Sequence, residues 1–320
     1  MTANRKRLLF VFLALVVLLA GFFVYKQLLQ DKPKVIVVVK EKDIEFWEIV
    51  KAGADKGFED FGVDGKVLAP KNGTPEEQSK ILNQALKENP DLLIVSPLGT
   101  DILLDLEKYT ERNIPVLLID SNAPWEHKTA YIGTDNLVLG EKAGILMASK
   151  LQPGEKVALL GRNKSFAEKD RLIGARKSLE AAGIQVAAEY GDNLEIGNKN
   201  VQKIKKVVDN IIEEHPDLKG IITTTDSIAI PAIKSIEEHK LEIPVTGTDG
   251  IREMLEYIKD GDLNISVSQN PYDMGYLSVE TADKVLKGKK VKQNIDSGVD
   301  IITKGNAEER LEFYNNILKK

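Results

Sequence analysis

The stretch Ile114-Pro115-Val116-Leu117-Leu118-Ile119-Asp120 recurs 129 residues later as Ile243-Pro244-Val245-Thr246-Gly247-Thr248-Asp249. Two further pairs of segments recur in the same order: residues 53–56 with 174–177, and residues 90–92 with 216–218. An order-preserving repeat of this length indicates two similar domains rather than a short-period solenoid. Each copy ends an apolar strand on an aspartate. Two such domains facing one another would form a cleft with an acidic group on each wall.

Short apolar runs alternate with helical segments along most of the chain. Residues 35–39 (VIVVV) form a continuous β-branched run, typical of a central parallel strand that is covered on both faces. Thr74 and Pro75 mark a helix start, as the cap and the first helical residue. Further strands are expected at residues 66–69, 92–95, 116–119, 130–132, 156–160, 185–189, 220–223, 244–247 and 264–267. This alternation predicts an α/β fold with two doubly wound parallel sheets.

The composition is that of a globular protein. The chain has 320 residues, of which 42% are hydrophobic and 29% are charged, and this length allows two domains with separate cores. The formal net charge of −5 argues against a nucleic-acid partner, since phosphate binding needs a basic face. The chain has no cysteine, which excludes disulfides, thiolate metal sites, a cysteine nucleophile and the lipid-modified cysteine that tethers many exported bacterial proteins.

The N-terminus carries a basic flank, residues 5–7 (Arg-Lys-Arg), before an apolar segment. Residues 8–24 are 17 uncharged residues, which reaches the lower limit for a membrane-spanning helix. A cleavable signal peptide needs a small-x-small site, and the one candidate, after Ala20, has Leu18 where a small residue is required. We therefore expect an uncleaved anchor, with a signal peptide as the alternative. The expected layout is residues 1–7 in the cytoplasm, 8–25 as a transmembrane helix, 26–33 as a linker, and the body outside the cell.

Ligands of open parallel sheets bind beyond the carboxyl ends of the strands. The residues expected there are Lys40 to Asp43, Phe46, Trp47, Asp120, Ser121, the segment 162–169, Asp226, Asp249 and Gln269. Each type has another interpretation. The aromatic pair could be core, an aspartate after a strand is often a cap or turn former, and Lys169 and Arg171 could lie on a solvated helix face. Because Asp120 and Asp249 occupy equivalent places in the repeat, a shared role is favoured for these two.

Together these residue types suit a monosaccharide. Ionised carboxylates accept two hydroxyl hydrogens at once, aromatic rings cover the apolar faces of a sugar, and Lys, Thr and Gln side chains pair with the remaining oxygens. Enzyme signatures are missing. The sequence has no phosphate loop, no dinucleotide fingerprint and no Gly-x-Ser-x-Gly elbow, and its three histidines share no metal-ligand spacing. The pattern therefore predicts a binding protein with no catalytic residue, cofactor or metal.

Several short segments carry a resemblance to a known family. Besides residues 114–120 they are IGTDN at 132–136, HPD at 215–217, GTDG at 247–250 and ETADKVLKG at 280–288. From Lys34 onward the chain resembles the ribose-type, class I periplasmic sugar-binding proteins, whose fold also occurs in the effector domains of LacI-type repressors. The resemblance implies two lobes joined by a three-segment hinge, with crossovers near residues 133–135, 268–270 and 297–299. The implied lobes are residues 34–132 plus 270–296, and residues 133–269 plus 297–320.

The resemblance also implies ligand-binding residues. The family's stacking aromatics correspond to Phe46 and Trp47, its cleft aspartates to Asp120 and Asp249, and its hinge glutamine to Gln269. Elsewhere the chain departs from the family: Ser121 stands where an arginine is usual, Lys169 replaces the helix-borne arginine with Arg171 two residues on, Thr225 replaces an asparagine, and Asn198 lies in a longer loop. These departures put ribose itself in doubt. A pentose such as xylose is the first expectation, and a non-sugar polyol signal is the alternative.

Two kinds of membrane partner suit such a protein. One is an ABC permease that accepts the sugar, and the other is a membrane sensor histidine kinase that reads the closed form. The missing lipid-attachment cysteine and the expected anchor favour the kinase, because an anchor holds the protein beside its partner. An enzyme on the same fold is the alternative from another class. A repressor is disfavoured, since an apolar segment stands where a DNA-binding domain would be needed.

Overall fold

The computed structural model describes residues 12, 32–162, 165–191, 201–261 and 265–318. Lys34–Lys320 forms one compact unit, distinct from Met1–Pro33. The segment expected to span the membrane, residues 8–25, lies outside the described residues except for Phe12. Within the described ranges, no helix is both long enough and apolar enough to cross a membrane.

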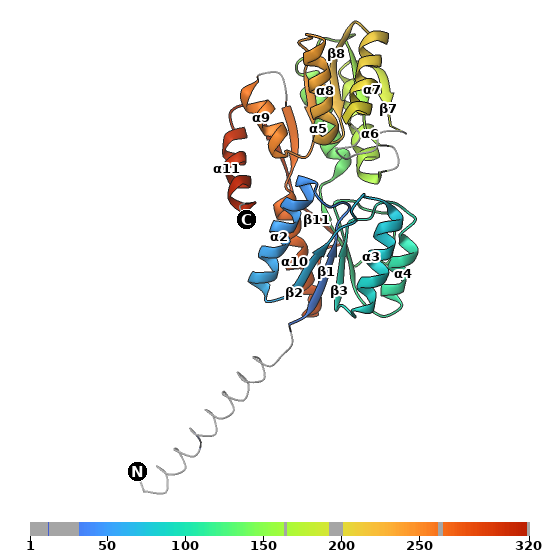
Figure 1. Ribbon diagram of the computed structural model, residues 1–320, viewed down its shortest axis with the longest axis vertical. Helices are drawn as coiled ribbons and strands as arrows, with labels where there is room; N and C mark the ends of the chain where they lie inside the picture. Colours follow the sequence, from blue (N-terminus) through green and yellow to red (C-terminus); the bar gives the residue numbers. More distant parts are fainter. Residues whose placement is uncertain (1–11, 13–31, 163–164, 192–200, 262–264, 319–320) are drawn as a thin grey trace, which may run out of the picture. The chain divides into compact units, whose positions relative to one another are not determined.

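The first lobe is built on a sheet of six parallel strands with helices on both faces (Figure 1). The strands are β1 (Lys34–Val38), β2 (Asp64–Leu68), β3 (Leu92–Val95), β4 (Val116–Ile119), β5 (Ala130–Gly133) and β11 (Asn294–Asp296), in the order β11-β5-β4-β3-β1-β2. The helices are α2 (Glu45–Phe61), α3 (Pro75–Lys87), α4 (Leu103–Thr110) and α10 (Pro271–Leu286).

Strand β1 shows why this sheet is covered on both sides. Side chains alternate between the two faces of a strand. Val35 and Val37 pack into the cluster that contains α2 and α10, whereas Ile36 and Val38 pack into the cluster that contains α3 and α4. All four are fully buried, so a continuous apolar run is what this position requires.

The second lobe repeats the arrangement with one difference. Its strands are β6 (Lys156–Leu160), β7 (Gln185–Tyr190), β8 (Leu218–Thr223), β9 (Val245–Gly247), β10 (Ile265–Gln269) and β12 (Val299–Ile302), in the order β12-β10-β9-β8-β6-β7. Its helices are α5 (Asn136–Ala148), α6 (Phe166–Ala181), α7 (Val201–Glu214), α8 (Asp226–Glu238), α9 (Arg252–Asp260) and α11 (Ala307–Ile317). The sequence predicts an entirely parallel sheet, but β12 runs antiparallel to β10, because the chain enters the sheet there by a short turn rather than by a crossover helix.

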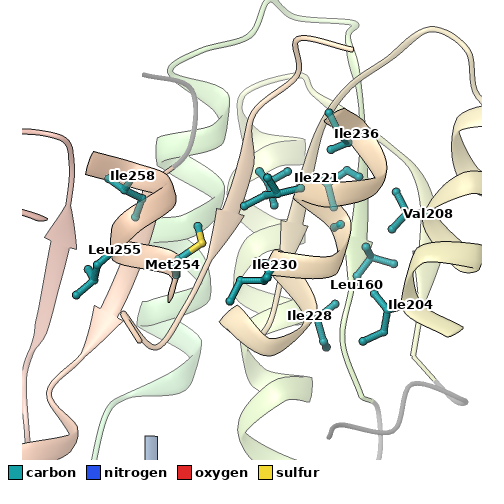
Figure 2. Packing of buried hydrophobic residues seen from close by; sticks show 14 of the residues in the cluster. Leu160, Ile204, Val208, Ile221, Ile228, Ile230, Ile236, Met254, Leu255 and Ile258 are labelled. Carbon is teal, nitrogen blue, oxygen red and sulfur yellow. The ribbon is translucent and has the colours of Figure 1, made fainter. Parts of the chain in front are cut away.

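The core of the second lobe also has two layers. Figure 2 shows the layer in which Leu160 and Ile221 of the sheet meet α7, α8 and α9, for instance through Val208, Ile228 and Met254. The other layer joins the sheet to α5 and α6. Both layers fix the carboxyl ends of the strands in the second lobe.

Three crossings connect the two sheets. The chain leaves the first sheet after β5, returns through α10 to β11, and crosses again between β11 and β12. Glycines of the repeat sit where helices pack closely beside these crossings. A Cβ on Gly53 of α2 would lie 2.0 Å from the carbonyl oxygen of Tyr272 in α10, and one on Gly174 of α6 would lie 2.2 Å from that of Leu137 in α5. Equivalent glycines therefore allow an equivalent helix pair in each lobe.

Candidate ligand-binding site

A cavity of about 70 Å³ lies at the carboxyl ends of the strands, between the two lobes. From the first lobe it is lined by Lys40, Glu41, Ile44, Phe46, Trp47, Gly73, Leu98 and Asp120. From the second lobe it is lined by Arg162, Ser165, Ala167, Glu168, Arg171, Thr225, Ser227 and Asp249. It is far smaller than the 300–1,000 Å³ typical of sites for drug-sized ligands. The arrangement suits one small polar molecule.

The two repeat aspartates reach the cavity through uncommon backbone conformations. Asp120 has φ 60° and Asp249 has φ 141°, both in the positive range that residues other than glycine seldom adopt. Asp120 directly follows β4, Asp249 lies two residues beyond β9, and both side chains are buried. Backbone strain of this kind tends to occur at functional sites. The repeat therefore preserves a positive φ as well as a residue type, although the two φ values differ.

Lys40 organises the wall of the first lobe. Its Nζ lies 2.6 Å from Asp120 Oδ2 and 2.6 Å from Ser121 Oγ, and it sits 5.7 Å from the centre of the Trp47 ring. Ser96 Oγ donates a further hydrogen bond to Asp120, at 3.1 Å. Burial alone would raise the pKa of Asp120, but Lys40, Arg171 and the hydrogen bond from Ser96 hold it below its usual value. Asp120 is therefore an ionised acceptor.

Phe46 and Trp47 belong to the core and to the cavity at once. Their ring centres are 4.9 Å apart and the rings are nearly perpendicular, at 86°. Both pack in the cluster of α2 and α10, and both line the cavity. The two interpretations of this pair, as core or as an apolar wall for a ligand, are thus compatible.

Arg171 and Gln269 hold Asp249 in the second lobe. Arg171 is buried and donates from Nη1 to Thr248 Oγ1 at 3.1 Å and to Asp249 Oδ1 at 3.4 Å. Gln269 donates from Nε2 to the same Oδ1 at 2.9 Å. Burial raises the pKa of Asp249 to about 6, although Arg171 and Gln269 work against the shift. Gln269 acts on the cavity through Asp249, since it is not itself among the lining residues.

Two buried oxygens at the site have no partner among the described residues. Thr225 Oγ1 belongs to a residue that lines the cavity, and Gln269 Oε1 belongs to the residue that holds Asp249. Buried polar atoms are nearly always hydrogen-bonded. These two oxygens are places where a polar ligand or a water would supply the missing hydrogen bond.

The structure places Lys169 away from the other candidates. Lys169 is exposed and borders a hollow on the outer surface with Leu172 and Arg176. The reason is helical phase. Glu168 and Arg171 are three residues apart, share the buried face of α6 and line the cavity, whereas Lys169 is turned away from that face. Asn198, the other weakly matched candidate, lies outside the described residues.

Four charged residues that the resemblance did not select line the cavity. They are Lys40, Glu41, Arg162 and Glu168. Lys40 and Arg162 are each the second residue after their strands, so the strand-end rule points to both, but no motif distinguishes them from other surface cations. Glu168 could have been recognised by its spacing of three from Arg171. Among the described residues, no group of His, Asp and Glu side chains is arranged to hold a metal ion.

Comparison with known proteins agrees with this geometry. The family model described as a periplasmic binding protein domain matches residues 35–290. The ribose import binding protein RbsB of Escherichia coli (strain K12) is 28% identical over 277 residues, which cover 85% of this chain and 91% of that protein. RbsB of Bacillus subtilis (strain 168) is 27% identical over 260 residues, which cover 81% and 83%.

A solved structure is also similar to this chain. GanP, a glucose-galactose binding protein from Geobacillus stearothermophilus, is similar with a TM-score of 0.80 at 25% identity, over 87% of this chain and 99% of that one. These relatives are binding proteins and not enzymes. Because the family model spans most of the sequence, this chain belongs to the periplasmic binding protein domain family.

Proposed function

We propose that this protein binds a neutral monosaccharide outside the cytoplasm and closes its two lobes around it. The observation that carries the proposal is the pair Asp120 and Asp249, which line one cavity from equivalent strand ends of the two lobes. A ligand bound to both aspartates would bridge the lobes. It would then shift the population toward the closed form by its differential affinity for that form.

The chemistry of the cavity favours a sugar. Asp120 offers an ionised carboxylate to hydroxyl groups, and the rings of Phe46 and Trp47 offer an apolar wall. A hydroxyl-rich ligand could also satisfy the unpartnered oxygen of Thr225. An unpaired buried polar group costs about 1–3 kcal/mol, so these contacts would discriminate between sugars.

The ligand we propose is a pentose, such as ribose or xylose. Two relatives are named as ribose import binding proteins, which supports a pentose. The chain differs from the family pattern at Ser121, Lys169 and Thr225, so a pentose other than ribose fits the proposal equally. The lobes we assign to its two sides are residues 34–132 plus 270–296, and residues 133–269 plus 297–320.

The partner we propose is an ABC permease, because the relatives are named for import. Residues 8–25 would hold the protein at the outer face of the membrane, with the N-terminus in the cytoplasm. A sensor histidine kinase is the other outcome of a pull-down from membranes with sugar present. Recovery of permease subunits supports the transport role, and recovery of a histidine kinase in their place would overturn it.

A thermal-shift screen against pentoses, hexoses and polyols tests the ligand class. A ligand at 100 times its dissociation constant should add about 2.7 kcal/mol to the free energy of unfolding. We expect a clear rise in melting temperature with a neutral pentose. If no sugar raises it while a non-sugar polyol does, the sugar assignment is wrong and the same cleft serves another ligand.

A further inference from the structure

Glu168 is a buried carboxylate that holds the side chain of Arg162 in place. It is only 2% exposed, and it accepts hydrogen bonds from the backbone nitrogen of Arg162 at 2.9 Å, from Arg162 Nε at 2.7 Å and from Thr224 Oγ1 at 2.7 Å. Arg162 Nη2 lies 2.5 Å from the same carboxylate. Burial opposes the charge on the guanidinium, but Glu168 outweighs it and keeps the pKa of Arg162 above its usual value. The guanidinium is therefore charged and fixed in orientation.

Arg162 retains donors that point to no described partner. A guanidinium has five N–H donors. Nε and Nη2 face Glu168, and within the described part of the chain no hydrogen bond is recorded for Nη1. Arg162 lines the cavity, and its side chain is 29% exposed. Its free edge is thus presented to whatever occupies the cavity.

Each cation around the cavity is paired with a carboxylate. The three cations Lys40, Arg162 and Arg171 are paired with Asp120, Glu168 and Asp249 respectively. Glu41 is a fourth carboxyl on the opposite wall, where burial raises its pKa and Arg162 lowers it. The site therefore has no surplus positive charge with which to attract an anion.

We propose that Arg162 determines specificity, by donating hydrogen bonds from its free edge to a ring or hydroxyl oxygen of an uncharged sugar. This inference rests on the proposed function of the same cleft. Glu168 is the positioning residue, and by neutralising Arg162 it also excludes sugar acids.

The test uses the full chain in detergent and isothermal titration calorimetry with ribose, xylose, arabinose and their single-deoxy analogues. A charge-assisted hydrogen bond lost from a closed site weakens binding by about 10- to 100-fold. We expect Arg162→Met to show this loss for the preferred sugar and almost none for the one deoxy analogue that lacks the contacted oxygen. Arg162→Lys, which keeps the charge but not the planar fork, should give an intermediate loss.

The matched control is Lys169→Met on the outer face of α6, which should bind like the unmodified protein. The inference is overturned if Lys169→Met weakens binding and Arg162→Met does not. It is equally overturned if Arg162→Met weakens the sugar and every deoxy analogue by the same factor, since that pattern means a structural role. If the unmodified protein is folded and binds no neutral sugar, the proposed function itself fails.

Glu168→Gln tests the neutralising role separately. The amide keeps the shape of the side chain but leaves the charge on Arg162 uncompensated. We expect affinity for a sugar acid such as glucuronate, relative to glucose, to rise by at least about tenfold. An unchanged ratio, with both ligands weakened alike, would show that Glu168 only supports the fold.

Discussion

Asp226 positions Asp249 without lining the cavity. It is fully buried, and its Oδ2 accepts the backbone N–H groups of Gly250 at 2.5 Å and Ile251 at 3.0 Å, while its own N–H donates to Asp249 Oδ2 at 3.3 Å. Burial, together with the nearby charge of Asp249, raises the pKa of Asp226 from 3.8 to about 8. A neutral carboxyl thus supports the turn that carries the ligand-facing aspartate.

The Asp226 pKa predicts a pH dependence of stability. Between about pH 4 and pH 8 the folded protein keeps a proton that the unfolded chain releases, so this group makes the free energy of unfolding fall as the pH rises. Asp226→Asn cannot ionise and should flatten this decline, with little loss at pH 5. Urea unfolding at pH 5 to 8 measures how the free energy of unfolding changes with pH in the variant and in the unmodified protein. Equal slopes for the variant and the unmodified protein would contradict the prediction.

At the scale of single residues, the sequence predicts one part of the site better than the other. Asp120 and Asp249 were identifiable because the repeat places them at equivalent strand ends. Arg162 and Glu168 lie in the segment 162–169 that the strand-end rule indicates, but the sequence does not single them out. The role of Glu168 depends on which face of α6 meets the cavity, and a highly charged helix gives little indication of its buried face. Lys169, the residue that the resemblance selected, lies on the exposed side of α6, one residue away from Glu168, which lines the cavity.

At the scale of elements, the close pairing of α5 with α6 depends on Gly174. A Cβ there would lie 2.2 Å from Leu137 O and 2.7 Å from Glu141 N, both backbone atoms that cannot move aside alone. Gly174→Ala should therefore cost about 1–3 kcal/mol of stability by overpacking. Gly99→Ala is the control, because a Cβ at Gly99 meets nothing within 4 Å. Chemical denaturation compares the two, and equal stabilities would refute this view of the helix pair.

The positions of the strands, but not their order in the sheets, were largely predictable at this scale. Continuous apolar runs such as residues 35–39 identify central parallel strands. The antiparallel β12 was not predictable, because an edge strand formed after a short turn has only a brief amphipathic pattern. Edge strands bury less surface, and the signal in their sequence is weaker accordingly.

At the scale of the whole molecule, Glu45 links the lobes. It belongs to the first turn of α2, and it contacts Arg252, the first residue of α9. The backbone N–H of Arg252 donates to Glu45 Oε1 at 2.6 Å, and Arg252 Nε donates to Glu45 Oε2 at 3.1 Å. The residue that precedes α9, Ile251, provides no side-chain cap. Glu45 therefore caps a helix of the opposite lobe and stabilises the arrangement of the two lobes in this structure.

Glu45 does not line the cavity, but removing its contact with Arg252 should weaken ligand binding. Glu45→Ala should lower sugar affinity by about 3- to 30-fold, since it loses a charge-assisted contact made when the lobes meet. The matched control is Glu48→Ala, an exposed residue of the same helical turn. Calorimetry gives the affinities, and small-angle scattering at saturating sugar reports closure. An unchanged affinity for Glu45→Ala would show that this contact does not contribute to closing.

The most direct test of the central claim is the dissociation constant of the preferred neutral sugar for the unmodified protein, Asp120→Ala and Asp249→Ala. Both aspartates line the cavity, one from each lobe, so each loss should weaken binding by about 100-fold or more while leaving the protein folded. That result would establish a ligand that bridges the lobes. Binding retained at full strength in either variant would contradict it.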